Sequence, residues 1–173
     1  MLKVIALAGL QGSGKSTVAE ALASKLHLPI FSVDPIEASI IKSGIKKSFE
    51  TGLAAYLVAD TLADEQLKFS QSVIIDAANY HPEAHNMWEK LAMKRNATLI
   101  KIECICSNKE LHEQRINKRT RNLHGIDEIT WKNVQKRQKE SKSWGGEKLL
   151  LDTAKGLDEN VALAIKYIQA ARQ

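Results

Sequence analysis

Hydrophobic positions along the chain follow two alternating patterns. Short runs of consecutive apolar residues are typical of strands that are buried on both faces of a parallel sheet. Between these runs, apolar residues recur every three or four positions, as on the buried face of an amphipathic helix. The runs predict strands at residues 4–8, 29–33, 72–75, 97–102 and 148–151. The periodic segments predict helices at residues 16–26, 36–41, 53–69, 82–94, 109–119, 128–142 and 158–171.

This order of elements predicts the fold class. Strands that alternate with helices of this length indicate an α/β protein with a five-stranded parallel sheet and helices on both faces. The chain has 173 residues, of which 44% are hydrophobic and 26% are charged, so residues 1–173 are most simply one domain. No apolar run approaches the roughly 20 residues that span a bilayer, and we expect no membrane partner.

The turn after the first predicted strand carries the most specific chemical signal. Residues 9–16 read Gly-Leu-Gln-Gly-Ser-Gly-Lys-Ser and match the pattern G-x-x-x-x-G-K-[ST] at every fixed position. Glycines let consecutive backbone amides turn inward around an anion, the lysine reaches the outer phosphates, and the serine hydroxyl can ligate Mg²⁺. The helix that opens at Thr17 adds a favourable dipole. The alternative is a glycine-rich strand-to-helix turn without a ligand. We therefore predict ATP and Mg²⁺ as cofactors, held by Gly9, Gln11, Gly12, Ser13, Gly14, Lys15, Ser16 and Thr17.

Two carboxylates follow apolar strands and are candidates for chemistry. Asp34 ends the second predicted strand and Asp76 ends the third. In open parallel sheets, ligands bind outside the carboxyl ends of the strands, where the glycine-rich turn also lies. We predict that Asp76 supports the metal and that Asp34 faces an acceptor substrate as a base or orienting group. Alternatively, either residue caps the following helix. Asp152, after the last strand, is predicted to be a turn residue.

Positive charge is concentrated in the segment 109–142. It holds ten Lys and Arg against five Asp and Glu, a net charge of +5 that equals the formal net charge of the whole chain. Such a helical hairpin could be a lid over phosphates, a nucleic-acid patch or a solvated surface. Arg115 and Arg119 favour the lid, because residues four apart share a helix face and arginine suits bidentate phosphate contacts.

The two cysteines bear on the compartment. Cys104 and Cys106 are two residues apart on a predicted strand, which is too close for an easy disulfide. Reduced structural cysteines favour a cytoplasmic protein.

The chain resembles the small P-loop kinases related to zeta toxins, chloramphenicol phosphotransferase, polynucleotide 5′-kinases and AAA-type ATPase domain kinases. The resemblance rests on residues 9–17, 32–34, 73–79 and 113–119, which span most of the chain in the order typical of that group. It implies a P-loop NTPase fold of the nucleotide kinase type, with a helical lid and transfer of the γ-phosphoryl of ATP, usually to a hydroxyl. It also implies that Asp34 is the acceptor-side base. Arg115 and Arg119 would be lid arginines, one near adenine and one on phosphate.

The chain departs from that group on the acceptor side. Members commonly carry an arginine shortly after the second-strand aspartate and another in the helix after the third strand. Neither the segment 35–39 nor the segment 83–88 contains one. This absence argues against an acceptor that is itself a phosphate monoester, although Lys42, Lys46 and Lys47 could substitute as point charges.

These observations predict a phosphotransferase with Lys15, Asp34, Arg115 and Arg119 as catalytic residues, and with Ser16 and Asp76 at the metal. A small-molecule hydroxyl is the favoured acceptor, and the segment 36–69 carries no pattern that identifies it. One alternative is a nucleotide-dependent ATPase switch that binds a protein partner. Another is a polynucleotide 5′-hydroxyl kinase, which the basic hairpin permits but the 5% aromatic content does not favour.

Overall fold

Five parallel strands form one sheet in the order β2-β3-β1-β4-β5. The computed structural model describes residues 1–79, 81–120, 122–141 and 144–171. The strands are β1 (Lys3–Ala8), β2 (Ile30–Ser32), β3 (Val73–Asp76), β4 (Thr98–Ile105) and β5 (Leu149–Asp152). The predicted α/β class with a five-stranded parallel sheet is therefore confirmed.

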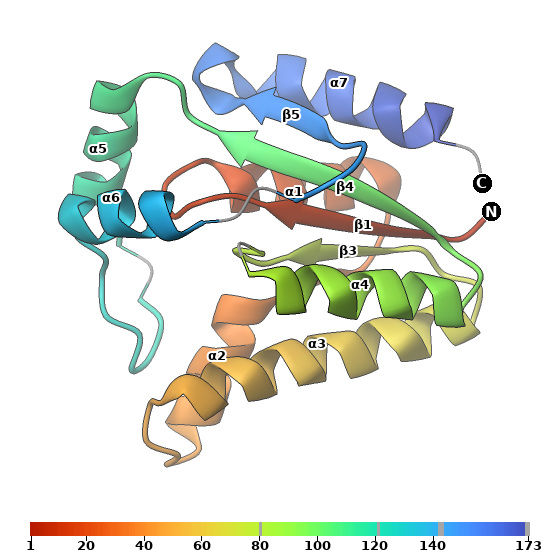
Figure 1. Ribbon diagram of the computed structural model, residues 1–173, viewed down its shortest axis with the longest axis horizontal. Coiled ribbons are helices and arrows are strands. Elements are labelled where there is room, and N and C mark those ends of the chain that lie inside the picture. Colours follow the sequence, from red (N-terminus) through yellow and green to blue (C-terminus); the bar gives the residue numbers. More distant parts are fainter. Residues whose placement is uncertain (80, 121, 142–143, 172–173) are drawn as a thin grey trace.

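Helices connect the strands and cover both faces of the sheet (Figure 1). They are α1 (Lys15–Leu26), α2 (Val33–Lys42), α3 (Phe49–Lys68), α4 (Pro82–Lys94), α5 (Lys109–Lys118), α6 (Trp131–Glu140) and α7 (Leu157–Ala170), with a 3₁₀ turn at Thr153–Lys155. Among the described residues, no helix is both long and apolar enough to cross a membrane.

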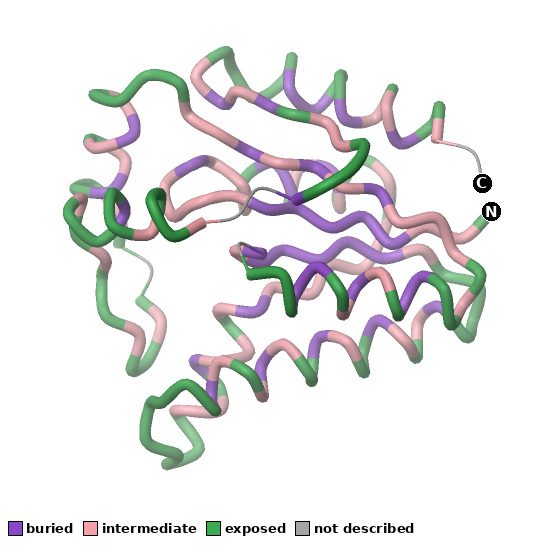
Figure 2. The backbone as a smooth tube through the Cα atoms, viewed as in Figure 1, coloured by how far each residue is buried: buried purple, intermediate pink, exposed green. Residues whose placement is uncertain are grey.

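Side chains of the central strand β1 enter two hydrophobic clusters, one on each face of the sheet. Successive side chains of a strand point to opposite faces. Val4, Ala6 and Ala8 pack with the buried residues of α3 and α4, whereas Ile5 and Leu7 pack with those of α1 and α7. The core therefore lies on both sides of β1, as the continuous purple of the central strands shows (Figure 2).

The boundary between β2 and α2 differs from the predicted one. We expected a strand to Val33 with Asp34 at its end, but β2 stops at Ser32, and Val33 and Asp34 begin α2. Pro35 lacks an amide hydrogen and is tolerated in the first turn of a helix, where it needs no partner. An aspartate there is also favoured by the helix dipole. Asp34 thus lies in the first helical turn, and Ser32 is the N-cap residue.

The basic hairpin is present, with shorter helices than predicted. We use "lid hairpin" for residues 109–141, which comprise α5, α6 and their connection; the predicted end at residue 142 lies outside the described residues. The hairpin lies at the end of the sheet towards which the labelled strands point (Figure 1). The fold therefore brings the basic segment and the carboxyl ends of the strands to one edge.

Candidate nucleotide and phosphoryl-transfer site

The phosphate loop, residues 9–16, is fixed by close packing against β4. The Gly9 amide donates to the Ala78 carbonyl at 3.1 Å, and the Ser13 amide donates to the Leu10 carbonyl at 3.1 Å. A Cβ atom on Gly9 would lie only 2.4 Å from the Cys104 carbonyl oxygen, and the residue has φ +146°. Only glycine fits this position without moving β4.

Two carbonyls of the loop accept hydrogen bonds from elements outside it. His112 of α5 lies with Nε2 2.7 Å from the Gln11 carbonyl oxygen. The Thr153 hydroxyl donates to the Ser13 carbonyl at 2.8 Å. The loop is thus held from α5 on one side and from the segment after β5 on the other.

Lys15 lies between the two residues predicted to support a metal. Its Nζ is 2.5 Å from Asp76 Oδ1 and 3.4 Å from Ser16 Oγ, and both charged side chains are nearly buried. Ser32 Oγ donates to the other oxygen of Asp76 at 3.2 Å. Because β1 pairs with β3 so that Leu7 is level with Asp76, the carboxylate stands beside the phosphate loop. Asp76 thus lies at the sheet edge where the sequence placed it. Its side chain does not cap α4, because His81 is the N-cap residue of that helix.

The donor set around Lys15 suits a hard cation that keeps several waters. Among the described residues there is no cluster of three or more His, Cys, Asp or Glu that could hold a metal. One carboxylate, one hydroxyl and the oxygens of a phosphate chain are the usual partners of Mg²⁺. The Lys15 ammonium stands within reach of both protein oxygens, so a positive charge already occupies this position.

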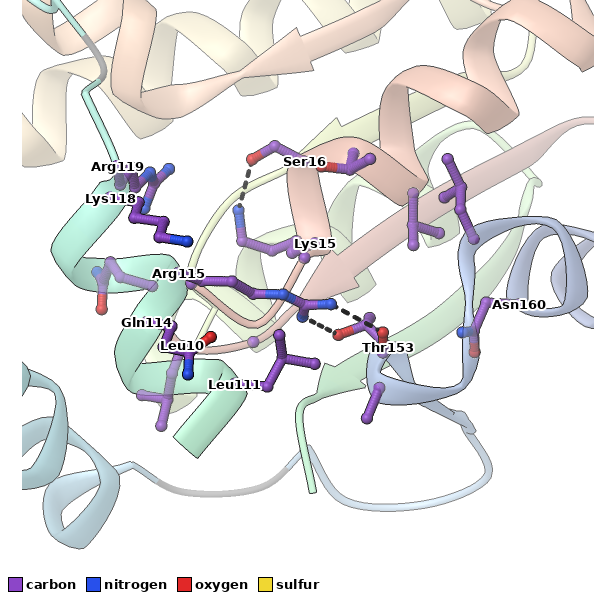
Figure 3. Close-up of a pocket in the computed structure, with 18 of the residues that line it drawn as sticks. Leu10, Lys15, Ser16, Leu111, Gln114, Arg115, Lys118, Arg119, Thr153 and Asn160 are labelled. Carbon is purple, nitrogen blue, oxygen red and sulfur yellow. Dashed lines mark hydrogen bonds between the residues drawn. The ribbon is translucent and has the colours of Figure 1, made fainter. Parts of the chain in front are cut away.

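A cavity of about 600 Å³ opens in front of the loop (Figure 3). Most of the predicted binding residues line it, namely Gly9, Gln11, Gly12, Gly14, Lys15, Ser16 and Thr17. Asp34 of α2 lines the same cavity, as do Arg115, Lys118 and Arg119 of the lid hairpin. The structure therefore brings the predicted phosphate, acceptor-side and lid residues around one space.

Ser13 is placed differently from its neighbours. Its side chain is 1% exposed and lines a second cavity of about 230 Å³ on the other side of the loop, not the main one. Its hydroxyl oxygen is buried and finds no hydrogen-bond partner among the described residues. Ser13, predicted as a binding residue, therefore does not turn its side chain towards the main cavity.

Arg115 and Arg119 both line the cavity but differ in how they are held. Arg115 donates from Nη1 to the Thr153 hydroxyl at 2.7 Å and from Nη2 to the Thr153 carbonyl at 3.0 Å (Figure 3). Arg119 is the C-cap of α5, with extended backbone, because the helix ends at Lys118. The two arginines therefore do not share one regular helix face as predicted, although both reach the same space.

The end of β5 contributes residues that the sequence did not single out. The cavity is also lined by Thr153, Ala154, Gly156 and Asn160. Asp152, predicted as a turn residue, is instead the last residue of β5 and the N-cap of the 3₁₀ turn that follows. Its Oδ1 accepts from the Ala154 amide at 3.1 Å and from the Ser107 amide at 3.0 Å. The Ser107 hydroxyl also binds it and holds the pKa of this carboxyl below its usual value. One signal could have revealed these residues: β5 is a parallel strand and must end at the same sheet edge as the phosphate loop.

The loop after β3 is a structural junction. Asn79 is buried with φ +50°; its Nδ2 donates to the Leu7 carbonyl at 2.7 Å and its Oδ1 accepts from Trp88 at 2.8 Å. This residue fixes the ends of β1 and β3 relative to α4.

The cysteines are free, as predicted. Burial raises the pKa of the Cys104 thiol to about 12, so it stays protonated at neutral pH.

Comparison with known proteins supports this description. No curated protein matches the chain at a significant level. Many solved structures share the fold, and three of them serve as examples that cover nearly the whole of both chains. A provisionally assigned kinase from Chloroflexus aurantiacus is 21% identical with TM-score 0.78 and covers 99% of each chain. Kti12 of Chaetomium thermophilum, in complex with ADP-AlF3, is 16% identical with TM-score 0.73 and covers 98% of this chain and 100% of its own.

A sugar kinase from Janibacter sp. HTCC2649 is 15% identical with TM-score 0.72 and covers 99% of this chain and 96% of its own. The AAA domain family matches residues 4–141, which is most of the chain. The protein therefore belongs to the AAA domain family, with the fold of the small P-loop kinases.

Proposed function

We propose that the protein is an ATP-dependent phosphotransferase that moves the γ-phosphoryl group of ATP to a hydroxyl of a small molecule. The observation that carries this proposal is that a carboxylate, Asp34, lines the same cavity as the phosphate loop and two arginines. A loop that binds ATP would be equally consistent with a nucleotide-dependent ATPase switch. A carboxylate opposite the loop is the additional group that an acceptor hydroxyl requires.

The residues around the cavity divide the work of phosphoryl transfer. The loop amides and Lys15 hold the phosphate chain, and Ser16 and Asp76 would hold Mg²⁺, which neutralises charge on the phosphates when bound. Lys15 now pairs with Asp76 at 2.5 Å, so it exchanges this carboxylate for phosphate oxygens when nucleotide binds. Little covalent chemistry remains for the protein, and catalysis consists mainly of positioning and charge stabilisation.

Asp34 orients the acceptor hydroxyl and accepts its proton. Arg119 stabilises charge on the transferred phosphoryl group, and Arg115, anchored on Thr153, faces the nucleoside. The lid hairpin excludes water from the cavity, which limits hydrolysis and strengthens the electrostatic contacts.

We call the side of the cavity that Asp34 of α2 lines the acceptor wall. Its residues favour a substrate that carries no phosphate group. Of the described residues that line the cavity, the cationic side chains come from the phosphate loop and the lid hairpin, and none comes from α2 or α3. Lys42, Lys46 and Lys47 lie at the far end of α2 and beyond it, where Lys47 pairs with Asp127 at 3.3 Å. An acceptor phosphate would find no cationic clamp on this wall. The likeness to a sugar kinase supports the same choice.

The test is transfer of label from γ-labelled ATP to pooled sugars, nucleosides, antibiotics and 5′-hydroxyl oligonucleotides. We expect label on a small molecule. Label on the oligonucleotides would instead identify a polynucleotide kinase. Label found only in free phosphate would identify an ATPase switch.

A further inference from the structure

Two carbonyl groups of the phosphate loop accept hydrogen bonds from residues outside the loop. The Gln11 carbonyl accepts from His112 Nε2 at 2.7 Å, and the Ser13 carbonyl accepts from the Thr153 hydroxyl at 2.8 Å. A carbonyl can only accept, so His112 carries its proton on Nε2. The contacts come from two different elements, α5 and the turn after β5.

These contacts also fix the direction of two amides. In a planar trans peptide, the carbonyl and the amide hydrogen of the next residue point in opposite directions. Turning the Gln11 carbonyl towards His112 therefore turns the Gly12 amide away from α5. Turning the Ser13 carbonyl towards Thr153 likewise turns the Gly14 amide away from Thr153.

The amide between them is used differently. The Ser13 amide donates to the Leu10 carbonyl at 3.1 Å, which closes the turn of the loop. No group in the described parts of the chain accepts from the amides of Gly12 or Gly14, and both glycines line the 600 Å³ cavity. These two donors are thus available to an anion in the cavity.

We propose that His112 and Thr153 are positioning residues that orient the Gly12 and Gly14 amides for a bound polyphosphate. The inference rests on the proposed function only in that the loop binds a nucleoside polyphosphate. It assigns to two residues outside the loop the task of setting the loop's anion-binding geometry before the ligand arrives.

Both residues are themselves firmly held. His112 is 7% exposed and packs edge-on against Trp131 of α6, with ring centroids 5.0 Å apart. Thr153 is 8% exposed, and its hydroxyl accepts from Arg115 at 2.7 Å while it donates to Ser13. A charged donor polarises the hydroxyl and strengthens the bond that the hydroxyl makes in turn. Arg115 therefore reinforces the contact between Thr153 and the loop.

The two residues also touch the loop sterically. A Cβ on Gly12 would lie 3.0 Å from His112 Cδ2 and 2.8 Å from Ile116 Cδ1. A Cβ on Gly14 would lie 3.0 Å from three atoms of the Thr153 side chain. His112 and Thr153 thus lie close against the glycines whose amides they orient, and leave no space for a side chain at either position.

The experiment measures binding of magnesium tripolyphosphate and of MgATP to the full chain by calorimetry. Tripolyphosphate reports on the phosphate contacts without the nucleoside contacts, because it has no nucleoside. Thr153→Val removes the hydroxyl and keeps the shape, and His112→Phe removes the donor and keeps a ring against Trp131. Each should weaken both ligands by about 5- to 10-fold, the value of one hydrogen bond. Thr153→Ser, which keeps the hydroxyl, should stay within about 2-fold of the parent protein.

The alternative roles give different results. If tripolyphosphate binding is unchanged while MgATP binding falls, these residues shape the nucleoside wall and the inference is wrong. In the Arg115→Ala background, Thr153→Val should still weaken tripolyphosphate binding; no further loss would mean that Thr153 acts only through Arg115 and would also overturn it. If Thr153→Val does not fold, as judged by its thermal melt, His112→Phe decides. A parent protein that binds neither ligand refutes the proposed function instead.

Discussion

The two walls of the main cavity are held together in different ways. On the nucleotide wall, polar contacts fix almost every group: His112 to Gln11, Thr153 to Ser13, Arg115 to Thr153, and Lys15 to Asp76. On the acceptor wall, Asp34 of α2 lines the cavity, and α2 in turn packs against α3, mainly through apolar side chains. The buried residues of α3 are Thr51, Ala55, Ala59, Ala63 and Leu67.

This difference shows which part of the site is built in advance. A polyphosphate is the same in every nucleotide, and oriented donors bind it with little reorganisation. Among the described residues, the acceptor wall offers one cavity-lining carboxylate, Asp34, and the polar contacts of α2 and α3, such as Glu37 with Thr51, involve residues that do not line the cavity. Much of α3 is also exposed and apolar, with Phe49 81% and Leu57 51% exposed. Under the proposed function, acceptor choice would therefore depend on packing and loop position rather than on a fixed polar pattern.

The largest effect should follow from removing Lys15 on the nucleotide wall. Lys15→Ala deletes the mobile charge that replaces water around the outer phosphates, and it leaves Asp76 without its ion-pair partner. We expect ATP turnover to fall by about 10³-fold or more. Lys25→Ala, at the exposed far end of α1, is the matched control and should leave turnover unchanged. Comparable turnover in both variants would contradict the role of the loop.

Asp34→Asn tests whether phosphoryl transfer can be lost at the acceptor wall while ATP binding at the nucleotide wall is kept. The substitution keeps the size of the side chain but cannot accept the acceptor proton, so transfer should fall by about 10²-fold or more. ATP affinity, measured by calorimetry, should change by less than about 3-fold, because the nucleotide wall is intact. Glu37→Gln is the control one helical turn away, where the carboxylate binds the Thr51 hydroxyl at 2.9 Å instead of lining the cavity. Normal transfer by Asp34→Asn would remove Asp34 as the base.

Gly125→Ala tests how the lid hairpin meets the acceptor wall. Gly125 has φ +68°, and an added Cβ would lie 2.3 Å from Ile41 Cγ2 at the end of α2. The connection 122–130 should leave α2, and its amides should exchange hydrogen at least about 10-fold faster. ATP affinity should not change.

Gly146→Ala is a matched control for this substitution. It has φ +78°, but the nearest atom to an added Cβ is Lys101 Nζ at 3.8 Å, so it shares the backbone strain without the clash. Equal exchange in both variants would mean that the contact with Ile41 does not hold the connection.

The sequence predicted the nucleotide wall better than it predicted the way this wall is supported. The phosphate loop and Asp76 could be found because their residue types and positions after strands are themselves the signal. His112 and Thr153 could not, because their part in the site depends on the direction of two carbonyls, which residue patterns do not encode. Asp34 was found as a residue, but its place in the first turn of α2 was missed, since apolar Val33 extends the strand-like run.

The smallest expected effect concerns how α3 is attached to the C-terminal end of α4. Asp64 of α3 accepts from Arg95 Nε at 2.6 Å and Nη2 at 2.7 Å, and from Lys94 at 3.0 Å. Arg95 holds the pKa of this carboxyl far below its usual value of 3.8. A lowered pKa in the folded state stabilises the fold above the ordinary pKa, and this stabilisation is lost as the pH falls below about 4.

Asp64→Asn should therefore lower the free energy of unfolding by about 1 kcal/mol at pH 7, measured in urea, and by less at pH 3. Glu65→Gln, which breaks the exposed pair with Lys68 on the same helix, should cost less at both pH values. If hydrogen exchange in Asp64→Asn accelerates across α2 and α3 but not around the phosphate loop, the acceptor wall opens independently of the nucleotide wall. Uniform acceleration would show that the two walls unfold as one unit, and the contrast between them would then lie in their chemistry alone.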